Sequence, residues 1–141
     1  MKLLVEIVTP EKSIFRDEEI DAAVITASEG EITILPGHIP LFTKINPGEM
    51  RLLKAGKEIS LAVTGGFLEY ADNELTILAD YAIRSEDIVE ENAKKAIENA
   101  KKAMAEKTEI ISDLEAESAL KRALLELKVV QRKKKAYVHE S

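Results

Sequence analysis

Two glutamates and a histidine stand close together in the stretch from Ser28 to Pro40. Glu29 and Glu31 flank a glycine, and His38 follows a short alternating run. Carboxylates and imidazole are the groups that general acid–base catalysis uses most often. They also bind metal ions, but one histidine and two glutamates without further ligands form a weak set. Because no nucleophile constellation, second histidine or oxyanion loop accompanies them, we expect solvated turn residues, with no catalytic residue and no metal site.

Two further stretches have residue types that bind phosphate. Gly65-Gly66 lies between apolar runs, but no Gly-Lys-Ser/Thr follows it, so we interpret it as a bulge or a close approach of backbones. The basic end, Lys128 with Arg132 to Lys135, has the charge to meet phosphates, anionic lipid or an acidic protein segment. The alternative is a solvated helix end whose cations complement the helix dipole.

The histidine stands in a segment that predicts a rigid surface turn. Pro36 and Pro40 push the residues before them, Leu35 and Ile39, toward extended backbone. Gly37 between them adopts a positive φ at little cost. The segment therefore has the character of a preformed contact surface, with the two carboxylates at the opposite end of a short strand.

The elements that position these residues follow from composition and pattern. Hydrophobic residues make up 45% of the 141 residues and charged residues 33%, which is typical of a globular chain. No apolar run is long enough to cross a bilayer, and the first residues do not form a signal peptide, so we expect membrane contact only through partners. The absence of cysteine excludes disulfides and thiolate sites.

Charge is unevenly distributed along the chain. Residues 1–85 contain 8 Lys and Arg against 14 Asp and Glu, a net charge of −6, whereas residues 86–141 contain 12 of each. Nucleic-acid binding needs a basic surface, so an acidic first part argues against it.

The first part alternates in short apolar runs separated by turn signals. Such a pattern indicates an all-β sandwich or barrel over residues 1–84. Ala71-Asp72-Asn73-Glu74 is a hairpin signal between two of the runs. The expected strands cover residues 2–9, 14–16, 20–27, 32–35, 41–45, 50–54, 59–63, 67–70 and 75–78.

The pattern changes to a helical one in residues 85–141, and we expect an antiparallel two-helix hairpin there. Asp87 with Glu90, and Ser112 with Glu115, have capping-box spacing, and a break is expected at Lys107–Glu109. Each helix has a stripe of small and apolar residues at spacings of three and four. The first stripe is Val89, Ala93, Ala96, Ala100 and Ala103, widened by Ile97 and Met104, and the second is Ala116, Ala119, Leu120, Ala123, Leu127 and Val130.

The alanine content of these stripes has an energetic consequence. A fully buried large aliphatic side chain contributes roughly 1.5–3 kcal/mol, and alanine contributes much less. We therefore hypothesise a weakly held hairpin that opens or docks elsewhere at modest cost. The alternative is an ordinary alanine-rich hairpin that stays closed.

Two segments carry a resemblance to a known family. The first runs from Glu29 through Pro36-Gly37-His38-Ile39-Pro40 to Leu41, and the second runs from Val63-Thr64-Gly65-Gly66-Phe67 to Asp80. Both segments, with Pro47–Arg51, the overall length and the order of strands before helices, resemble the epsilon subunit of the F-type ATP synthase. The resemblance covers essentially the whole chain.

The resemblance implies a non-catalytic subunit of the rotor stalk, peripheral to the cell membrane on its cytoplasmic side. It implies a β-sandwich that packs on the gamma subunit and on the ring of c subunits, which proton or sodium flow drives. In the family, the loops facing the ring include the positions of Glu29, Gly30, Glu31 and His38.

The resemblance also implies two states of the helical hairpin. In the family it lies folded on the sandwich, or it extends along gamma into the catalytic head and inhibits ATP hydrolysis. Basic side chains then meet acidic segments of the beta subunits, beside the alpha subunits. The candidates in this chain are Lys121, Arg122, Lys128 and Arg132.

One departure from the family concerns nucleotide. Some members bind ATP through an Ile-Asp-x-x-Arg-Ala pattern, and the corresponding positions here are Ile88, Val89, Asn92 and Ala93. Asn99 and Glu126 stand where such members place further arginines. Without these cations phosphate recognition is poor, so we expect no cofactor and at most weak ATP binding. The rival functions are a nucleotide-sensing module, which the missing arginines disfavour, and a small hydrolase using Glu29, Glu31 and His38.

Overall fold

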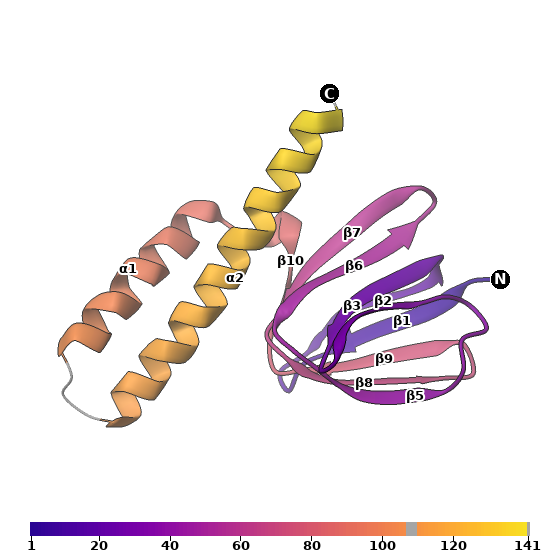
Figure 1. The fold of residues 1–141 in the computed structure, drawn as a ribbon, viewed down its shortest axis with the longest axis horizontal. Helices are drawn as coiled ribbons and strands as arrows, with labels where there is room; N and C mark the ends of the chain where they lie inside the picture. Colours follow the sequence, from indigo (N-terminus) through magenta and orange to yellow (C-terminus); the bar gives the residue numbers. More distant parts are fainter. Residues whose placement is uncertain (107–109, 141) are drawn as a thin grey trace. The chain divides into compact units, whose positions relative to one another are not determined.

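The computed structural model describes residues 1–106 and 110–140 of the chain. It divides into two compact units, Met1–Glu86 and Asp87–Ser141, which we describe separately. The first unit contains only strands and a short 3-10 turn, and the second contains two helices (Figure 1). The predicted break at Lys107–Glu109 lies outside the described residues.

The first unit consists of ten strands in chain order. They are β1 (Leu3–Val8), β2 (Ser13–Ile20), β3 (Ala22–Ala27), β4 (Gly30–Ile34), β5 (Leu41–Ile45), β6 (Gly48–Lys54), β7 (Lys57–Val63), β8 (Gly66–Ala71), β9 (Glu74–Ala79) and β10 (Ala82–Arg84). A 3-10 turn, η1 (Ser85–Asp87), follows, and the second unit contains α1 (Glu90–Glu106) and α2 (Ile110–Glu140).

The ten strands form one sheet that folds over into two layers, so the predicted sandwich is confirmed (Figure 1). One layer has the order β10-β7-β6-β3, with β4 paired to the other side of β3, and the second has the order β5-β8-β9-β1-β2. A single residue pair, Ala27 with Ile45, joins β3 to β5. Most neighbours are antiparallel, whereas β1 and β9 are parallel.

The core lies between the layers because the strands alternate. In β1, Leu3, Val5 and Ile7 are fully buried while the residues between them are half-buried. Each such aliphatic side chain contributes roughly 1.5–3 kcal/mol on burial. The largest fully buried side chains are Tyr70, Leu3, Ile7, Ile20, Ile34, Ile45, Met50, Leu52, Leu61, Leu68, Leu75 and Ile77.

Most strands differ from their predicted bounds by one or two residues at an end, whereas β2 differs by more and β10 is an additional strand. β2 runs for eight residues instead of three, because its charged part pairs with β1 and its side chains form ion pairs. Arg16 lies 3.1 Å from Glu6, and Lys54 of β6 lies 2.6 Å from Asp17. β4 begins at Gly30 and ends at Ile34, so Leu35 is outside it. β10 was not predicted, since a three-residue strand exists only through its pairing with β7.

The second unit contains the two predicted helices side by side (Figure 1). The predicted cap at Asp87 is wrong. Asp87 belongs to the preceding 3-10 turn, and the carbonyl of Val89 accepts the first helical hydrogen bond, from the amide of Ala93 at 3.1 Å. Glu90, the expected reciprocal partner, pairs with Lys134 and Lys94 instead. The second predicted cap is also wrong, since α2 begins at Ile110 and already includes Ser112.

The predicted stripes are confirmed in their central parts. Ala93 and Ala100 of α1 and Ala116 and Ala123 of α2 are buried. Val89 and Ala103, at the ends of the first stripe, are exposed. Those two assignments were wrong because α1 starts only at Glu90 and the packed face ends before its last turn.

Candidate functional site

The two glutamates lie at a tight hairpin. β3 and β4 pair from Ala23 with Ile34 to Ala27 with Gly30, which leaves Ser28 and Glu29 as the two-residue turn. Gly30 has a φ of 127°, a value that side chains disfavour. Glu29 and Glu31 are exposed. The Glu31 carboxylate lies 3.3 Å from the guanidinium of Arg51 on β6, so this edge of the sheet presents one carboxylate that is paired with a cation.

The histidine follows a type II turn at the other end of β4. The amide of His38 donates to the carbonyl of Leu35 at 3.1 Å, with Pro36 and Gly37 at the central positions. Gly37 has a φ of 84°, close to the value of about 80° that this turn type requires. The predicted tight turn is therefore confirmed, and its geometry follows from the Pro-Gly pair.

This loop, Pro36–Pro40, is tied to the turn between β8 and β9. The amide of Gly37 donates to Oδ1 of Asn73 at 3.0 Å, and the hydroxyl of Tyr70 donates to the same oxygen at 2.7 Å. The imidazole of His38 stands edge-on to the Tyr70 ring, with centroids 5.7 Å apart and planes at 90°. Sequence reasoning identified His38 but missed Asn73, whose role depends on a contact 36 residues away.

The imidazole of His38 has a defined tautomer in this geometry. Its Nδ1 lies 2.7 Å from the carbonyl oxygen of Ile39. A carbonyl oxygen only accepts, so Nδ1 is the nitrogen that has the proton. In the neutral ring Nε2 then holds the lone pair. The neutral form of His38 therefore has its acceptor at Nε2.

The structure places the glutamates and the histidine at opposite ends of β4. Five residues of strand span about 16 Å at roughly 3.3 Å per residue, far beyond hydrogen-bond reach. Because the strand separates them, Glu29 and Glu31 are not placed as hydrogen-bond partners of His38, which gives no support to the hydrolase alternative. Among the residues that the structure describes, no group of three or more His, Asp or Glu is placed to hold a metal ion.

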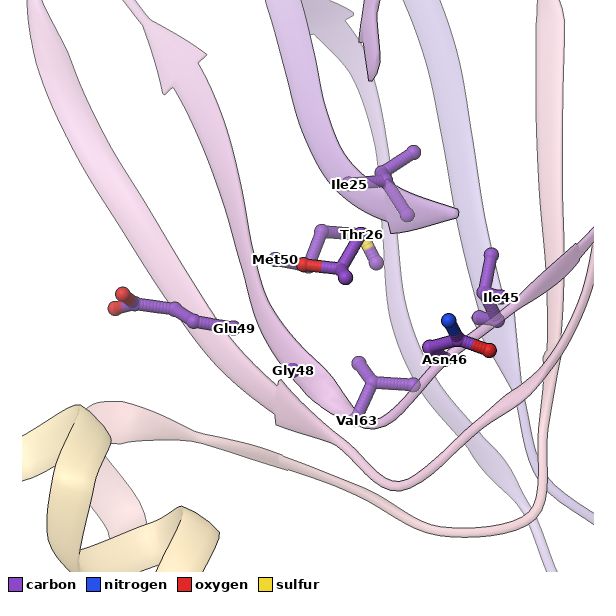
Figure 2. A pocket seen from close by; sticks show the side chains of 8 residues that line it. All are labelled: Ile25, Thr26, Ile45, Asn46, Gly48, Glu49, Met50 and Val63. Atoms are coloured by element: carbon purple, nitrogen blue, oxygen red, sulfur yellow. The ribbon is translucent and has the colours of Figure 1, made fainter. Parts of the chain in front are cut away.

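A small cavity opens between β3, the end of β5, the start of β6 and the end of β7, and Figure 2 shows its lining. Its volume is about 10 Å³, which is near the lower limit for a single water and far below the roughly 300 Å³ of a small-ligand pocket. The cavity is too small to hold a nucleotide. The lining residues are Ile25, Thr26, Ile45, Asn46, Gly48, Glu49, Met50 and Val63.

The outer face of the second layer has an apolar stripe that sequence reasoning missed. Phe42, Phe67 and Leu78 are 67%, 48% and 53% exposed. The rings of Phe42 and Phe67 stack with centroids 5.9 Å apart and planes 12° apart. Phe67 pairs with Leu78 across β8 and β9, and Leu78 pairs with the half-buried Val8 of β1. We call these four residues the apolar stripe.

The stripe crosses four neighbouring strands, β5, β8, β9 and β1. A patch of exposed aromatic and aliphatic side chains with charged neighbours such as Lys44 and Glu69 is typical of a protein–protein contact. Its signal in the sequence was weak. In Phe67-Leu68 and Ile77-Leu78, adjacent apolar residues point to opposite faces, so one of each pair has to face outward.

The basic candidates lie on α2. Lys121, Arg122 and Lys128 are exposed, and Arg132 is half-buried. At 100° per residue, Lys121, Lys128 and Arg132 fall on one side of the helix, and Arg122 lies about a quarter turn away. Lys121 forms an ion pair with Glu117 at 3.2 Å, one turn before it. Three of the four predicted cations thus share a face.

An ion pair joins the ends of the hairpin. Lys134 of α2 contacts Glu90, and Lys94 lies 3.6 Å from the same carboxylate. The hydrogen bond from Lys134 is the main cause that holds the pKa of Glu90 below its ordinary value of 4.5. Farther along the two helices, Ala100 and Ala123 are buried.

The four positions of the nucleotide pattern are occupied by uncharged residues. Ile88 and Ala93 are buried, whereas Val89 is 55% exposed and Asn92 is exposed. The described helices include none that combines the length and the apolar character needed to span a membrane.

Comparison with known proteins shows similarity along nearly the whole chain. A family model described as the beta-sandwich domain of the ATP synthase delta/epsilon chain matches residues 2–85. The ATP synthase epsilon chain of Dehalococcoides mccartyi is 41% identical over 135 residues, which cover 95% of this chain and 96% of that relative. The epsilon chain of Chromobacterium violaceum is 41% identical over 136 residues, with the same coverage of 95% and 96%.

Two solved structures share the fold. A chain in the F1/c-ring structure of the Euglena gracilis mitochondrial ATP synthase has a TM-score of 0.69 at 24% identity, covering 85% of this chain and 76% of that one. A chain in the central stalk and c-ring structure from Tetrahymena thermophila has a TM-score of 0.56 at 16% identity, covering 92% and 97%. At these identities the similarity shows the fold alone.

Proposed function

Because the chain belongs to the family of ATP synthase epsilon chains, we propose that it is a non-catalytic rotor-stalk subunit that couples the catalytic head to the membrane ring and inhibits ATP hydrolysis through its C-terminal helices. The observation that carries the proposal is the match of both units, in order, to relatives of nearly the same length. We further propose that it is peripheral to the cell membrane on the cytoplasmic side, held there by its partners.

The apolar stripe is the surface that we assign to the gamma subunit. Exposed phenylalanines that stack on one another are costly to leave in water, and large aromatic side chains supply most of the affinity in many protein interfaces. A stalk subunit has to rotate with its partner as one body, which requires a contact of this apolar kind. The stripe supports the proposal because it runs across four neighbouring strands on one face of the sheet.

The two turns at the ends of β4 are assigned to the ring of c subunits. The first presents Glu29, Gly30 and Glu31, and the second presents His38 with an acceptor at Nε2. Both are rigid before any partner binds, since a two-residue hairpin holds one and a type II turn holds the other. Preformed turns lose little conformational entropy on binding, which suits a contact with short polar loops.

The hairpin is assigned to the inhibition of the head, made of alpha and beta subunits. The buried residues of the two helices include four alanines, which bury little apolar area, and the aliphatic Val129, so we expect separation of α1 and α2 to have a modest cost. Lys121, Lys128 and Arg132, with Arg122 beside them, then meet acidic segments. Each exposed ion pair contributes about 0–1 kcal/mol, so inhibition requires several of them together.

The test is ATP hydrolysis by the matching catalytic head, with and without the hairpin. A chain ending at Glu86 retains the core, whose buried residues lie between Leu3 and Ala82. We expect the full chain to slow hydrolysis and the shortened chain to bind gamma without slowing it. If both bind and neither slows hydrolysis, the sandwich is a coupling adaptor and the inhibitory role is wrong. If neither binds the head, the stalk assignment fails.

A charge variant refines this test. Replacement of Lys121, Lys128 and Arg132 by alanine should relieve inhibition while leaving gamma binding unchanged. The matched control replaces Lys95, Lys101 and Lys102, exposed lysines of α1, by alanine. Equal relief by both variants would show that net charge matters and that this face of α2 has no specific role.

We also propose that the isolated chain has no tight site for ATP. The positions that correspond to the aspartate and arginine of the pattern are the apolar Val89 and the neutral Asn92. Neither side chain neutralises a phosphate. Calorimetric titration with MgATP should detect no binding at submillimolar concentrations, and a submillimolar dissociation constant would overturn this part of the proposal.

A further inference from the structure

Asn73 occupies the two-residue turn that closes β8 and β9. The strands pair up to Ala71 with Glu74, and Asp72 and Asn73 have φ values of 52° and 61°. The carbonyl of Asn73 also accepts a hydrogen bond from the amide of Leu4 at 3.0 Å. The turn is therefore fixed by backbone interactions, and it does not need the side chain of Asn73 for its shape.

The side chain of Asn73 has a separate set of contacts. Its Oδ1 accepts hydrogen bonds from the amide of Gly37 at 3.0 Å and from the hydroxyl of Tyr70 at 2.7 Å. A backbone amide can only donate, so the amide oxygen, not the nitrogen, has to face the loop. One atom thus connects the β8–β9 turn to the Pro36–Pro40 loop.

The residue type supports this interpretation. A turn with two left-handed residues accepts glycine best at its second position, because glycine has no Cβ. Asparagine tolerates the conformation less well, and here it supplies what glycine cannot, a side-chain acceptor at the height of Gly37. The shape of the turn does not explain why residue 73 is asparagine, whereas the hydrogen bond to the Pro36–Pro40 loop does.

We propose that Asn73 is a positioning residue, whose amide oxygen fixes the Pro36–Pro40 loop and, through Tyr70, the imidazole of His38 in the geometry that meets the membrane ring. The role of this loop in coupling rests on the proposed function, whereas the hydrogen bonds of Asn73 to Gly37 and Tyr70 do not depend on it. Tyr70 is 2% exposed, so its hydroxyl has to find an acceptor inside the protein. Oδ1 of Asn73 is this acceptor. The orientation of the Tyr70 ring, which contacts the imidazole of His38, therefore depends on the same oxygen that binds the Gly37 amide.

The first experiment measures hydrogen exchange of the Gly37 amide in the full-length chain by NMR. Asn73→Gly keeps the left-handed turn and removes the acceptor, so protection of this amide should fall roughly tenfold. The ring protons of His38 should also change chemical shift as Tyr70 loses its partner. Asp72→Gly is the matched control, since it lies in the same turn at a similar φ and should change neither signal.

A conservative variant separates positioning from general loss of structure. Asn73→Asp retains a side-chain oxygen at the same place and should restore most of the Gly37 protection. Equal protection in wild type, Asn73→Gly and Asp72→Gly would overturn the proposal. The same is true if Asn73→Gly accelerates exchange evenly over all core amides, because the effect would then be a loss of global stability.

The second experiment measures coupling in the reconstituted synthase, as ions pumped per ATP hydrolysed. Asn73→Gly should lower this ratio, whereas Asp72→Gly and Asn73→Asp should leave it near the wild-type value. If Gly37 loosens and coupling stays unchanged, Asn73 positions the loop but the loop does not meet the ring. That outcome overturns the proposed ring contact, whereas unchanged exchange overturns the role of Asn73.

Discussion

Gly66, at the start of β8, is the residue where the backbone tolerates least change. It has a φ of 142°, and a Cβ built there would lie 2.0 Å from the carbonyl oxygen of Leu78 and 2.9 Å from the Cα of Ala79. Both neighbours are backbone of the adjacent strand, so they cannot move aside as a flexible side chain does. The neighbouring Gly65, also at a positive φ, has no such clash, since its nearest atom is 3.5 Å away.

We predict that Gly66→Ala lowers the free energy of unfolding by about 3 kcal/mol or more, since overpacking and backbone strain add. Gly56→Ala is the matched control. Gly56 also has a positive φ, 77°, but nothing lies within 4 Å of its Cβ position, so strain alone should cost about 1–2 kcal/mol. Urea unfolding measures both. Equal losses would show that the close approach at Gly66 relaxes.

At the scale of elements, the hairpin combines a seam of small side chains with one ion pair at its open end. Glu90 and Lys134 connect the start of α1 to the last turns of α2, and Lys94 supports Glu90 from one turn along. Both partners are near the surface, so salt screens the pair. The ion pair still contributes noticeably to the stability of the hairpin, because the alanines between the helices bury little apolar area.

We predict that Glu90→Gln lowers the hydrogen-exchange protection of the first turns of α1 by about two- to threefold at low salt, and by less at high salt. The pKa of Glu90 is lowered in the folded state. Its contribution is therefore present above the ordinary value of 4.5 and is lost as the pH falls through the lower folded value. Protection in the wild type should decline in that acidic range, and the variant should lack this decline.

Glu91→Gln is the control for this prediction, because Glu91 is the exposed neighbour in the same first turn. It removes the same charge near the helix N-terminus, so it has the same effect on the helix dipole. If both substitutions reduce protection equally, the dipole explains the loss and the ion pair with Lys134 contributes nothing.

At the scale of the whole molecule, the exposed stripe makes a prediction about assembly. Phe42→Ser with Phe67→Ser should weaken binding to the gamma subunit by at least about tenfold, since buried aromatic anchors dominate interface energies. The stability of the chain should change little, because Phe42 is 67% exposed and Phe67 is 48% exposed before binding. Surface plasmon resonance against gamma measures the affinity, and thermal unfolding provides the stability.

The control is Leu53→Ser on β6, which is 40% exposed and lies in the other layer of the sandwich. It removes a similar exposed apolar side chain away from the stripe. Normal gamma binding by the phenylalanine variant would mean that another face carries the contact. A loss of binding in both variants would point to general surface hydrophobicity rather than to the stripe.

Local patterns in the chain were enough to predict the fold class of each half and the turns of the candidate site. Alternation of period two and frequent turn signals require a sheet with two faces, and a helical period of small residues requires two packed helices. The turn at Pro36-Gly37 was predictable because proline and glycine restrict φ whatever surrounds them. The hairpin turn at Asp72-Asn73 was predictable for the same reason, since its signal is local.

Which of these segments contact one another could not be predicted from local patterns. β10 forms only because it pairs with β7, and the apolar stripe forms because β5, β8, β9 and β1 lie side by side. The loop that contains His38 is held by its hydrogen bond to Asn73. The start of α1 also moved, because the Glu90 carboxylate binds lysines instead of capping the helix. Local propensity acts within a few residues, whereas these features depend on contacts between distant segments, which form only when the two layers and the two helices have packed.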